Sequence, residues 1–101
     1  MKHINEAQFE EATKSGVTAV DFFATWCGPC RMMSTILEEV EESNPEINIV
    51  KVDVDENPNL ARKFGIMSIP TIVVMKDGEM AGKHVGLMQA DDFVDFVKSY
   101  E

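Results

Sequence analysis

The chain has 101 residues, which is enough to bury one hydrophobic core and too few for a second. Its formal net charge of −9 argues against binding to nucleic-acid phosphates and to anionic membrane surfaces, and indicates a protein that the charge keeps soluble. The sequence has no apolar run near the length of about 18 residues that a membrane helix needs, and its start lacks the apolar segment of a signal peptide. We therefore expect no membrane association and a cytoplasmic location.

The first predicted elements are a helix and a strand. Asn5 and Gln8 have the spacing of a capping box, which begins a helix that extends to about Ser15, with Gly16 as its C-cap. Residues 17–24 form a nearly continuous apolar run of β-branched and aromatic side chains. Such a run is typical of a strand that is buried on both faces.

The middle of the chain predicts a long helix, a second strand and a short helix. From residue 28 to 43, apolar side chains recur at helical spacing opposite a run of glutamates. Residues 47–54 are rich in isoleucine and valine and indicate a strand. Residues 55–58 provide a cap followed by a proline, which predicts a short helix that ends at Phe64.

The last third predicts a hairpin and a final helix. Residues 71–75 indicate a strand, and the turn at residues 76–79 contains the Asp-Gly pair that tight hairpins prefer. The returning strand reaches about Gly86. Residues 89–100 carry buried aromatic and aliphatic side chains at helical spacing, among them Phe96 and Tyr100.

In chain order, the predicted elements are helix, strand, helix, strand, helix, strand, strand and helix, with a further short strand near residues 2–5. Strands joined by helices are expected to be parallel, with right-handed crossovers, whereas the final hairpin is antiparallel. We therefore predict one α/β domain over residues 1–101. Its central mixed sheet has four to five strands and is flanked by helices on both faces.

Both cysteines lie in the segment Trp26-Cys27-Gly28-Pro29-Cys30, at the predicted junction of a strand and a helix. This C-x-x-C spacing next to a βαβ pattern indicates a dithiol/disulfide redox centre. The helix N-terminus favours a thiolate at Cys27, and Cys30 in the first turn can act as the resolving thiol. Gly28 permits a sharp entry into the helix, and Pro29 suits the first helical turn.

Two other interpretations of the cysteine pair have weaker support. A zinc site needs about four ligands, and only His3 and His84 remain, at no finger-like spacing. A permanent structural disulfide is uncommon in the cytoplasm, and so short a loop would stabilise the fold by only about 2 kcal/mol. We therefore expect no metal and no bound cofactor, because the Cys27–Cys30 dithiol is itself the redox centre.

The segment WCGPC resembles the active site of the thioredoxin family, and the order of the predicted elements is similar to the thioredoxin fold over essentially the whole chain. The resemblance implies a general protein-disulfide reductase with Cys27 as nucleophile and Cys30 as resolving thiol. It also implies protein disulfides as substrates and a thioredoxin reductase as the partner that supplies two electrons. We expect the protein to be a monomer.

An aspartate, Asp21, interrupts the apolar strand, where a carboxylate is not expected. From the residues alone, this position is either partly exposed or a buried acid with a raised pKa that exchanges a proton with Cys30. The family carries its buried aspartate at this spacing before WCGPC, and Lys51 matches the lysine that partners it. The resemblance thus implies the buried acid. Without it, Lys51 would be an ordinary lysine with its ammonium in water.

The segment Ile69-Pro70-Thr71 resembles the family's cis-proline loop. The resemblance implies that Pro70 is cis and that the Ile69 backbone pairs with an extended substrate segment, as in strand addition. It implies a flat, mostly apolar contact surface that is completed by Trp26, Gly65, Ile66, Val85 and Gly86. From the residues alone, core burial of Trp26 and simple strand termination at Gly86 stay open.

Three features depart from the family's pattern. Thr35 stands where the family usually has a proline that kinks the active-site helix, so we expect a straighter helix or a slight bend from threonine back-bonding. Phe23 replaces a common tryptophan, and Met67-Ser68 stand where the family often has a basic residue and a glycine. These departures bear on partner choice and redox potential rather than on the dithiol chemistry.

Two alternative functions stay open. A specialised redox partner, oxidant or isomerase of the same fold would use the same cysteines, but the Gly-Pro spacer resembles that of the reducing members. A non-catalytic interaction subunit would have no need of both thiols, the aspartate and the Ile-Pro loop. The sequence therefore favours a reductase.

Overall fold

The computed structural model describes residues 1–101 and contains a five-stranded sheet in the order β1-β3-β2-β4-β5. The strands are β1 (Lys2–His3), β2 (Val17–Phe23), β3 (Asn48–Asp53), β4 (Thr71–Lys76) and β5 (Glu79–Val85). The helices are α1 (Glu6–Thr13), α2 (Gly28–Ser43), α3 (Pro58–Lys63) and α4 (Ala90–Lys98). β3 is parallel to β1 and β2, whereas β4 is antiparallel to β2 and β5. The predicted mixed α/β sheet is confirmed.

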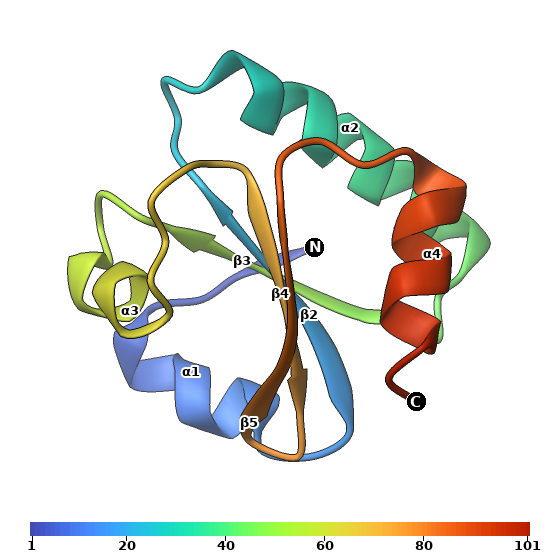
Figure 1. The fold of residues 1–101 in the computed structure, drawn as a ribbon, viewed down its shortest axis with the longest axis horizontal. Helices are drawn as coiled ribbons and strands as arrows, with labels where there is room; N and C mark the ends of the chain where they lie inside the picture. The colour runs from blue at the N-terminus through green and yellow to red at the C-terminus, as the bar shows by residue number, and fades with distance from the viewer.

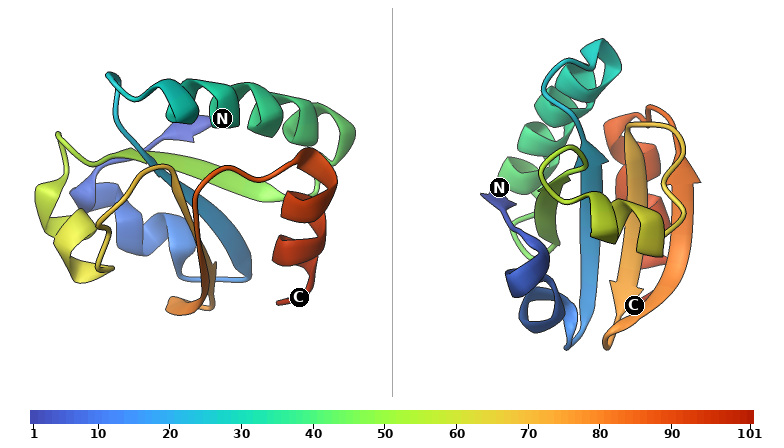
Figure 2. Two further views of the ribbon diagram at one scale, coloured as in Figure 1. Left: turned by 45° about the horizontal axis from the view of Figure 1, so that its top comes forward. Right: turned by 90° about the vertical axis from the view of Figure 1, so that its left-hand side faces the viewer.

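Helices cover both faces of the sheet: α1 and α3 lie on one side of the strands, and α2 and α4 on the other (Figures 1 and 2). Successive strand residues point to opposite faces, and both faces of β2 are buried. Val20 and Phe22 belong to the apolar cluster under α1 and α3, whereas Ala19 belongs to the cluster under α2 and α4. Asp21 therefore points to the side of the sheet that α2 and α4 cover.

The first helix begins as predicted but ends two residues earlier, at Thr13. The Asn5 side chain accepts a hydrogen bond from the Gln8 amide, and the Gln8 side chain accepts one from the Asn5 amide, which confirms the capping box. Gly16 is not the C-cap that the sequence predicts. Its φ is +70°, and it pairs with the distant β4–β5 turn, because its amide donates to the Asp77 carboxylate at 2.8 Å.

The long helix α2 has the bounds that the sequence predicts. In the β4–β5 turn, Asp77 and Gly78 have φ values of +50° and +87°, as the Asp-Gly pair predicts. One residue of β5, Ala81, has no partner, because Val74 pairs with Gly82 and Met75 pairs with Met80. This residue forms a β-bulge in the outer strand.

The last helix is shorter than the predicted range at both ends. Phe93 and Val97 are buried as expected, but Phe96 and Tyr100 are only half-buried. These two rings pack edge to face against each other, with centroids 5.5 Å apart, at the border of the core. No helix of the protein has the length and apolar character needed to cross a bilayer.

Candidate active site

The two cysteines lie at the N-terminus of α2 and form a disulfide. Cys27 is the N-cap residue with an extended backbone, and its sulfur accepts a hydrogen bond from the Cys30 amide at 3.2 Å. Pro29 occupies the first turn, where its missing N–H leaves no carbonyl unpaired. An N–H donor and the helix dipole at this sulfur stabilise negative charge when the disulfide is reduced.

Gly28 does not have the role that the sequence suggests. Its φ lies outside the left-handed region, and a Cβ atom at this position would have no neighbour within 4 Å. The entry into α2 therefore places no steric demand for glycine here. What Gly28 provides instead is an exposed surface without a side chain, next to Cys27.

The loop before β4 faces the cysteine pair. The Ile69–Pro70 peptide bond is cis, and the Ile69 carbonyl oxygen lies 3.9 Å from the Cys27 sulfur. The Ile69 side chain packs against the small apolar cluster that contains both cysteines. This loop and the N-terminus of α2 thus form one continuous surface.

Trp26 is not a core residue, because 68% of its surface is exposed. Its indole N–H donates to the Asp55 carboxylate at 2.7 Å. Trp26 also lines a small pocket of about 160 Å³ together with Val54, Ile66, Met67, Ser68 and Ile69. Asp55 is not among the residues predicted from the sequence, although a signal existed. β2 and β3 are parallel, so the segments that follow them meet at one edge of the sheet.

Two of the other predicted contact residues, Val85 and Gly86, lie beside the same loop. Gly86 follows the end of β5 with a φ of +101°, and its amide donates to the Pro70 carbonyl at 2.8 Å. Val85 is 55% exposed at the end of β5. Gly65 lies outside the small pocket; its carbonyl accepts a hydrogen bond from the Lys83 ammonium at 3.0 Å.

Asp21 and Lys51 are both buried. The interpretations in which the aspartate is partly exposed and the lysine ammonium lies in water are therefore wrong. Burial away from water raises the pKa of Asp21 to about 6, and the positive charge of Lys51 opposes this rise. The Lys51 nitrogen lies 3.9 Å from the nearer Asp21 oxygen. This separation is an ion pair without a hydrogen bond.

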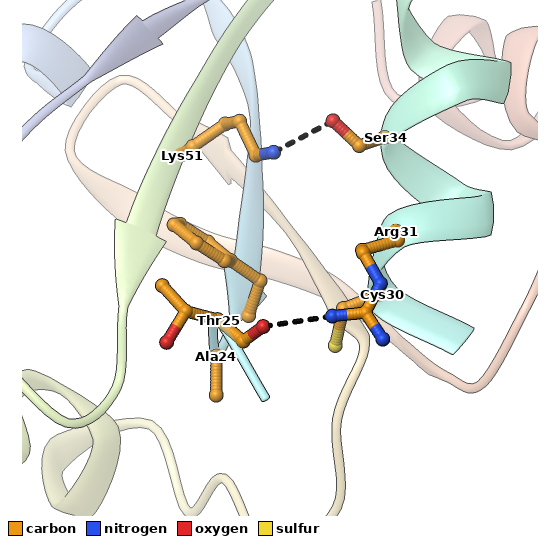
Figure 3. Close-up of a pocket in the computed structure, with 7 residues that line it drawn as sticks. Ala24, Thr25, Cys30, Arg31, Ser34 and Lys51 are labelled. Atoms are coloured by element: carbon orange, nitrogen blue, oxygen red, sulfur yellow. Dashed lines mark hydrogen bonds between the residues drawn. The ribbon is translucent and has the colours of Figure 1, made fainter. Parts of the chain in front are cut away.

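The hydrogen bond of the Lys51 ammonium goes to Ser34, at 2.8 Å, as Figure 3 shows. Cys30, Ser34 and Lys51 line a pocket of about 250 Å³. Arg31, at the rim, donates to the Thr25 carbonyl at 3.0 Å and ties α2 to the loop before it. Ser34 is not among the residues predicted from the sequence, although it lies one helical turn after Cys30 and so shares its side of α2.

Thr35 makes the hydrogen bond to the preceding helical turn that is one of the two outcomes predicted from the sequence. Its hydroxyl donates to the Arg31 carbonyl at 3.3 Å, and its side chain is exposed. The neighbouring hydroxyls of Ser34 and Thr35 therefore point to different surroundings. The Ser34 hydroxyl accepts a hydrogen bond from the buried Lys51, and the Thr35 hydroxyl donates one to the helix backbone.

Comparison with known proteins identifies the family: the model of the family named Thioredoxin matches residues 1–99. The chain belongs to the thioredoxin family. A thioredoxin from Listeria monocytogenes serovar 1/2a is 45% identical over 101 residues, covering 99% of this chain and 98% of that relative. A thioredoxin from Staphylococcus saprophyticus is 44% identical over 98 residues, with 96% of this chain and 94% of the relative covered.

Solved thioredoxins also have this fold. Fasciola hepatica thioredoxin superposes with a TM-score of 0.89 at 31% identity and full coverage of both chains, 100% each. A mutant thioredoxin from Halobacterium salinarum NRC-1 superposes with a TM-score of 0.88 at 34% identity, covering 98% of this chain and 90% of that one. The predicted thioredoxin fold and the prediction of a protein-disulfide oxidoreductase are thereby confirmed. Thioredoxins are reduced by thioredoxin reductases and need no cofactor beyond their cysteine pair.

Releasing Trp26 from Asp55 should weaken substrate contact without touching the cysteines. In Asp55→Ala, the indole loses a hydrogen bond to a charged acceptor, so we expect a KM for insulin that is about two- to fivefold higher, with kcat little changed. The fluorescence of this single tryptophan should shift as well. Glu56→Ala is the matched control, since Glu56 is exposed in the same turn and makes no bond to the indole. An unchanged KM in Asp55→Ala would contradict the prediction.

Proposed function

We propose that this chain reduces disulfides of target proteins by two successive thiol exchanges, with Cys27 as the nucleophile and Cys30 as the resolving thiol. The observation that carries this assignment is the position of the Cys27 sulfur. It accepts a hydrogen bond from the Cys30 amide at 3.2 Å. It also lies 3.9 Å from the Ile69 carbonyl oxygen, at the surface where a substrate strand would pair. Cys30 instead faces the pocket that Ser34 and Lys51 line.

In the first exchange, the Cys27 thiolate attacks one sulfur of the target disulfide. The other target sulfur leaves as a thiolate, and a mixed disulfide joins Cys27 to the target. Cys30 then passes its thiol proton to the Asp21 carboxylate and attacks the Cys27 sulfur. The Cys27–Cys30 disulfide forms, and the second target sulfur leaves. The target gains two electrons and takes up two protons, one of them from Asp21.

The protein groups around the sulfurs supply position rather than further chemistry. Holding both thiols in one helical turn makes the second exchange intramolecular, which supports a fast release of the target. Gly28 and Pro29 leave the approach to Cys27 uncrowded and rigid. Lys51 partners the Asp21 carboxylate electrostatically at 3.9 Å.

The substrate surface that we propose surrounds the Ile69–Pro70 loop. An extended target segment would pair with the Ile69 backbone, next to the Cys27 sulfur. Its side chains would contact the exposed Trp26 and the small apolar pocket. The remaining contact residues are Gly65, Ile66, Pro70, Val85 and Gly86.

We also propose the setting in which the reaction runs. The chain would act as a monomeric single domain over residues 1–101 in the cytoplasm, reduced by a thioredoxin reductase and without a bound metal or cofactor. Its charge of −9 and its bacterial thioredoxin relatives support this setting, and the charge argues against nucleic acid and membranes as partners.

Trapping of the mixed disulfide tests the two cysteine roles. Cys30→Ser, mixed with an oxidised target such as insulin, should accumulate a covalent adduct through Cys27, because the second exchange is lost. Cys27→Ser should form none under the same conditions. An adduct that forms through Cys30 would reverse the assignment of the two roles. A reduction potential well above that of the glutathione pool would favour the alternative function, in which the protein oxidises its targets.

A further inference from the structure

The Lys51 ammonium has three neighbours, and its hydrogen bond goes to one of them. The Ser34 hydroxyl lies at 2.8 Å, the Asp21 carboxylate at 3.9 Å, and the centroid of the Phe23 ring at 4.5 Å. An ammonium and a carboxylate in contact normally approach to about 2.7–2.9 Å. The Lys51 hydrogen bond goes to the Ser34 hydroxyl (dashed line in Figure 3), and the Asp21 carboxylate lies beyond this distance.

The Asp21 carboxyl is left without a protein donor. The side chain is completely buried, and neither of its oxygens accepts a hydrogen bond from the protein. On β4, its register partner is the apolar Ile72, and α4 packs on this face through Phe93 and Val97. In the row of paired residues that crosses the sheet at Asp21, the titratable side chains are His3 on β1, Lys51 on β3 and His84 on β5. The first turn of α2 adds Cys30 and Arg31. The acidic side chains of α2 and α4 are exposed, apart from the half-buried Glu41, which bonds the N-terminal ammonium.

Of these groups, Lys51 is the one at ion-pair distance from Asp21. His3 packs its ring against Phe23, and His84 packs against Phe96 on α4. Arg31 donates to the Thr25 carbonyl, which directs its charge to the rim of the pocket. The position of the Lys51 ammonium therefore decides how strongly a charged Asp21 is stabilised.

We propose that Ser34 is a positioning residue for the second exchange. Its hydroxyl holds the Lys51 ammonium back from the Asp21 carboxyl. The carboxyl thereby stays a strong enough base to take the Cys30 proton. The inference rests on the proton-acceptor role proposed for Asp21 above. Without the hydroxyl, the Asp21 carboxylate is the acceptor that lies within ion-pair distance of the Lys51 ammonium. The ammonium then closes onto the carboxylate in a charge-assisted hydrogen bond, which favours the charged form and lowers proton affinity.

Ser34→Ala tests this arrangement directly. In the oxidised protein, we expect the ionisation midpoint of Asp21 to fall by about one pH unit, a tenfold loss of proton affinity. The measurement is a carbon-13 NMR titration of the Asp21 carboxyl carbon, which reports on this group alone. Thr35→Ala is the matched control: it removes the neighbouring hydroxyl of the same helix, which bonds the Arg31 carbonyl, and should leave the midpoint in place. A midpoint that stays or rises in Ser34→Ala would overturn the inference.

The kinetic result distinguishes this inference from the proposed function. In the wild type, the rate of target release from the mixed disulfide should fall at low pH as Asp21 becomes protonated. In Ser34→Ala, this fall should move about one pH unit lower, and the rate at neutral pH should decrease, because a weaker base removes the Cys30 proton. If the wild type fails to reduce insulin, the proposed function fails. If it reduces insulin and the pH profile of Ser34→Ala coincides with its own, the role of Ser34 fails alone.

Discussion

Replacement of Cys27 by serine is expected to lower insulin reduction to the rate of dithiothreitol alone. A serine hydroxyl is not ionised at neutral pH and does not replace a thiolate as nucleophile. Cys30 is not expected to take over, because it lies in the pocket that Ser34 and Lys51 line, whereas the Cys27 sulfur lies 3.9 Å from the Ile69 carbonyl oxygen. The measurement is the turbidity of precipitating insulin chains over time, with dithiothreitol as the reductant.

The fold of this variant should survive. Serine is a favoured N-cap residue, so α2 keeps its beginning when serine replaces Cys27 at the N-cap. Cys30→Ser provides the comparison: it should also lose turnover, yet form the covalent adduct that Cys27→Ser does not. Multiple turnovers by Cys27→Ser, with its circular dichroism spectrum unchanged, would mean that another group attacks the disulfide.

Asp21→Asn is expected to remove a pH-dependent loss of stability. The ordinary pKa of this carboxyl is 3.8, and burial raises it to about 6 in the folded protein. Between these two pH values the folded protein binds more protons than the unfolded chain, so its free energy of unfolding decreases as the pH rises through this window. A shift of about two pH units corresponds to about 3 kcal/mol, fully expressed above pH 6.

Chemical denaturation at pH 4 and pH 7 checks the sign and the size. The difference in unfolding free energy between Asp21→Asn and the wild type should change by about 2 kcal/mol in favour of the variant between these pH values, because a part of the full effect is already expressed at pH 4. Comparing differences cancels the titration of the other carboxylates. Asp95→Asn alters an exposed aspartate on α4 and should give no such change. If the difference in unfolding free energy is the same at both pH values, burial does not raise the pKa of Asp21. If Asp21 takes the Cys30 proton as we propose, the same variant should also slow target release.

The features that the sequence predicts well are those set by nearby residues. The bounds of α2 follow from Pro29 in its first turn and from Asn44-Pro45 directly after its last residue, and the Asp-Gly turn follows from its own two residues. The sequence places the end of α1 too late because Gly16 bonds to Asp77, which is 61 residues away. No local pattern contains that pairing.

The candidate site divides in the same way. WCGPC and the aspartate in an apolar strand are visible in the sequence, because both break local expectations. The hydrogen bonds from Lys51 to Ser34 and from Trp26 to Asp55 are not, since each joins two elements that only the fold brings together. Ser34 by itself is one more polar residue on a helix. Its role depends on the distance to a lysine on β3.

The outer strands of the sheet also bear on how this protein avoids aggregation. An open strand edge is a template on which another copy of a chain can add. At one edge, β1 has only two residues; at the other, β5 is interrupted by the bulge at Ala81 and carries Lys83. Neither edge offers the long, flat ladder that self-association needs. The strand addition that we propose for target segments is therefore left to the Ile69–Pro70 loop, because the sheet edges are poorly suited to pair with another copy of this chain.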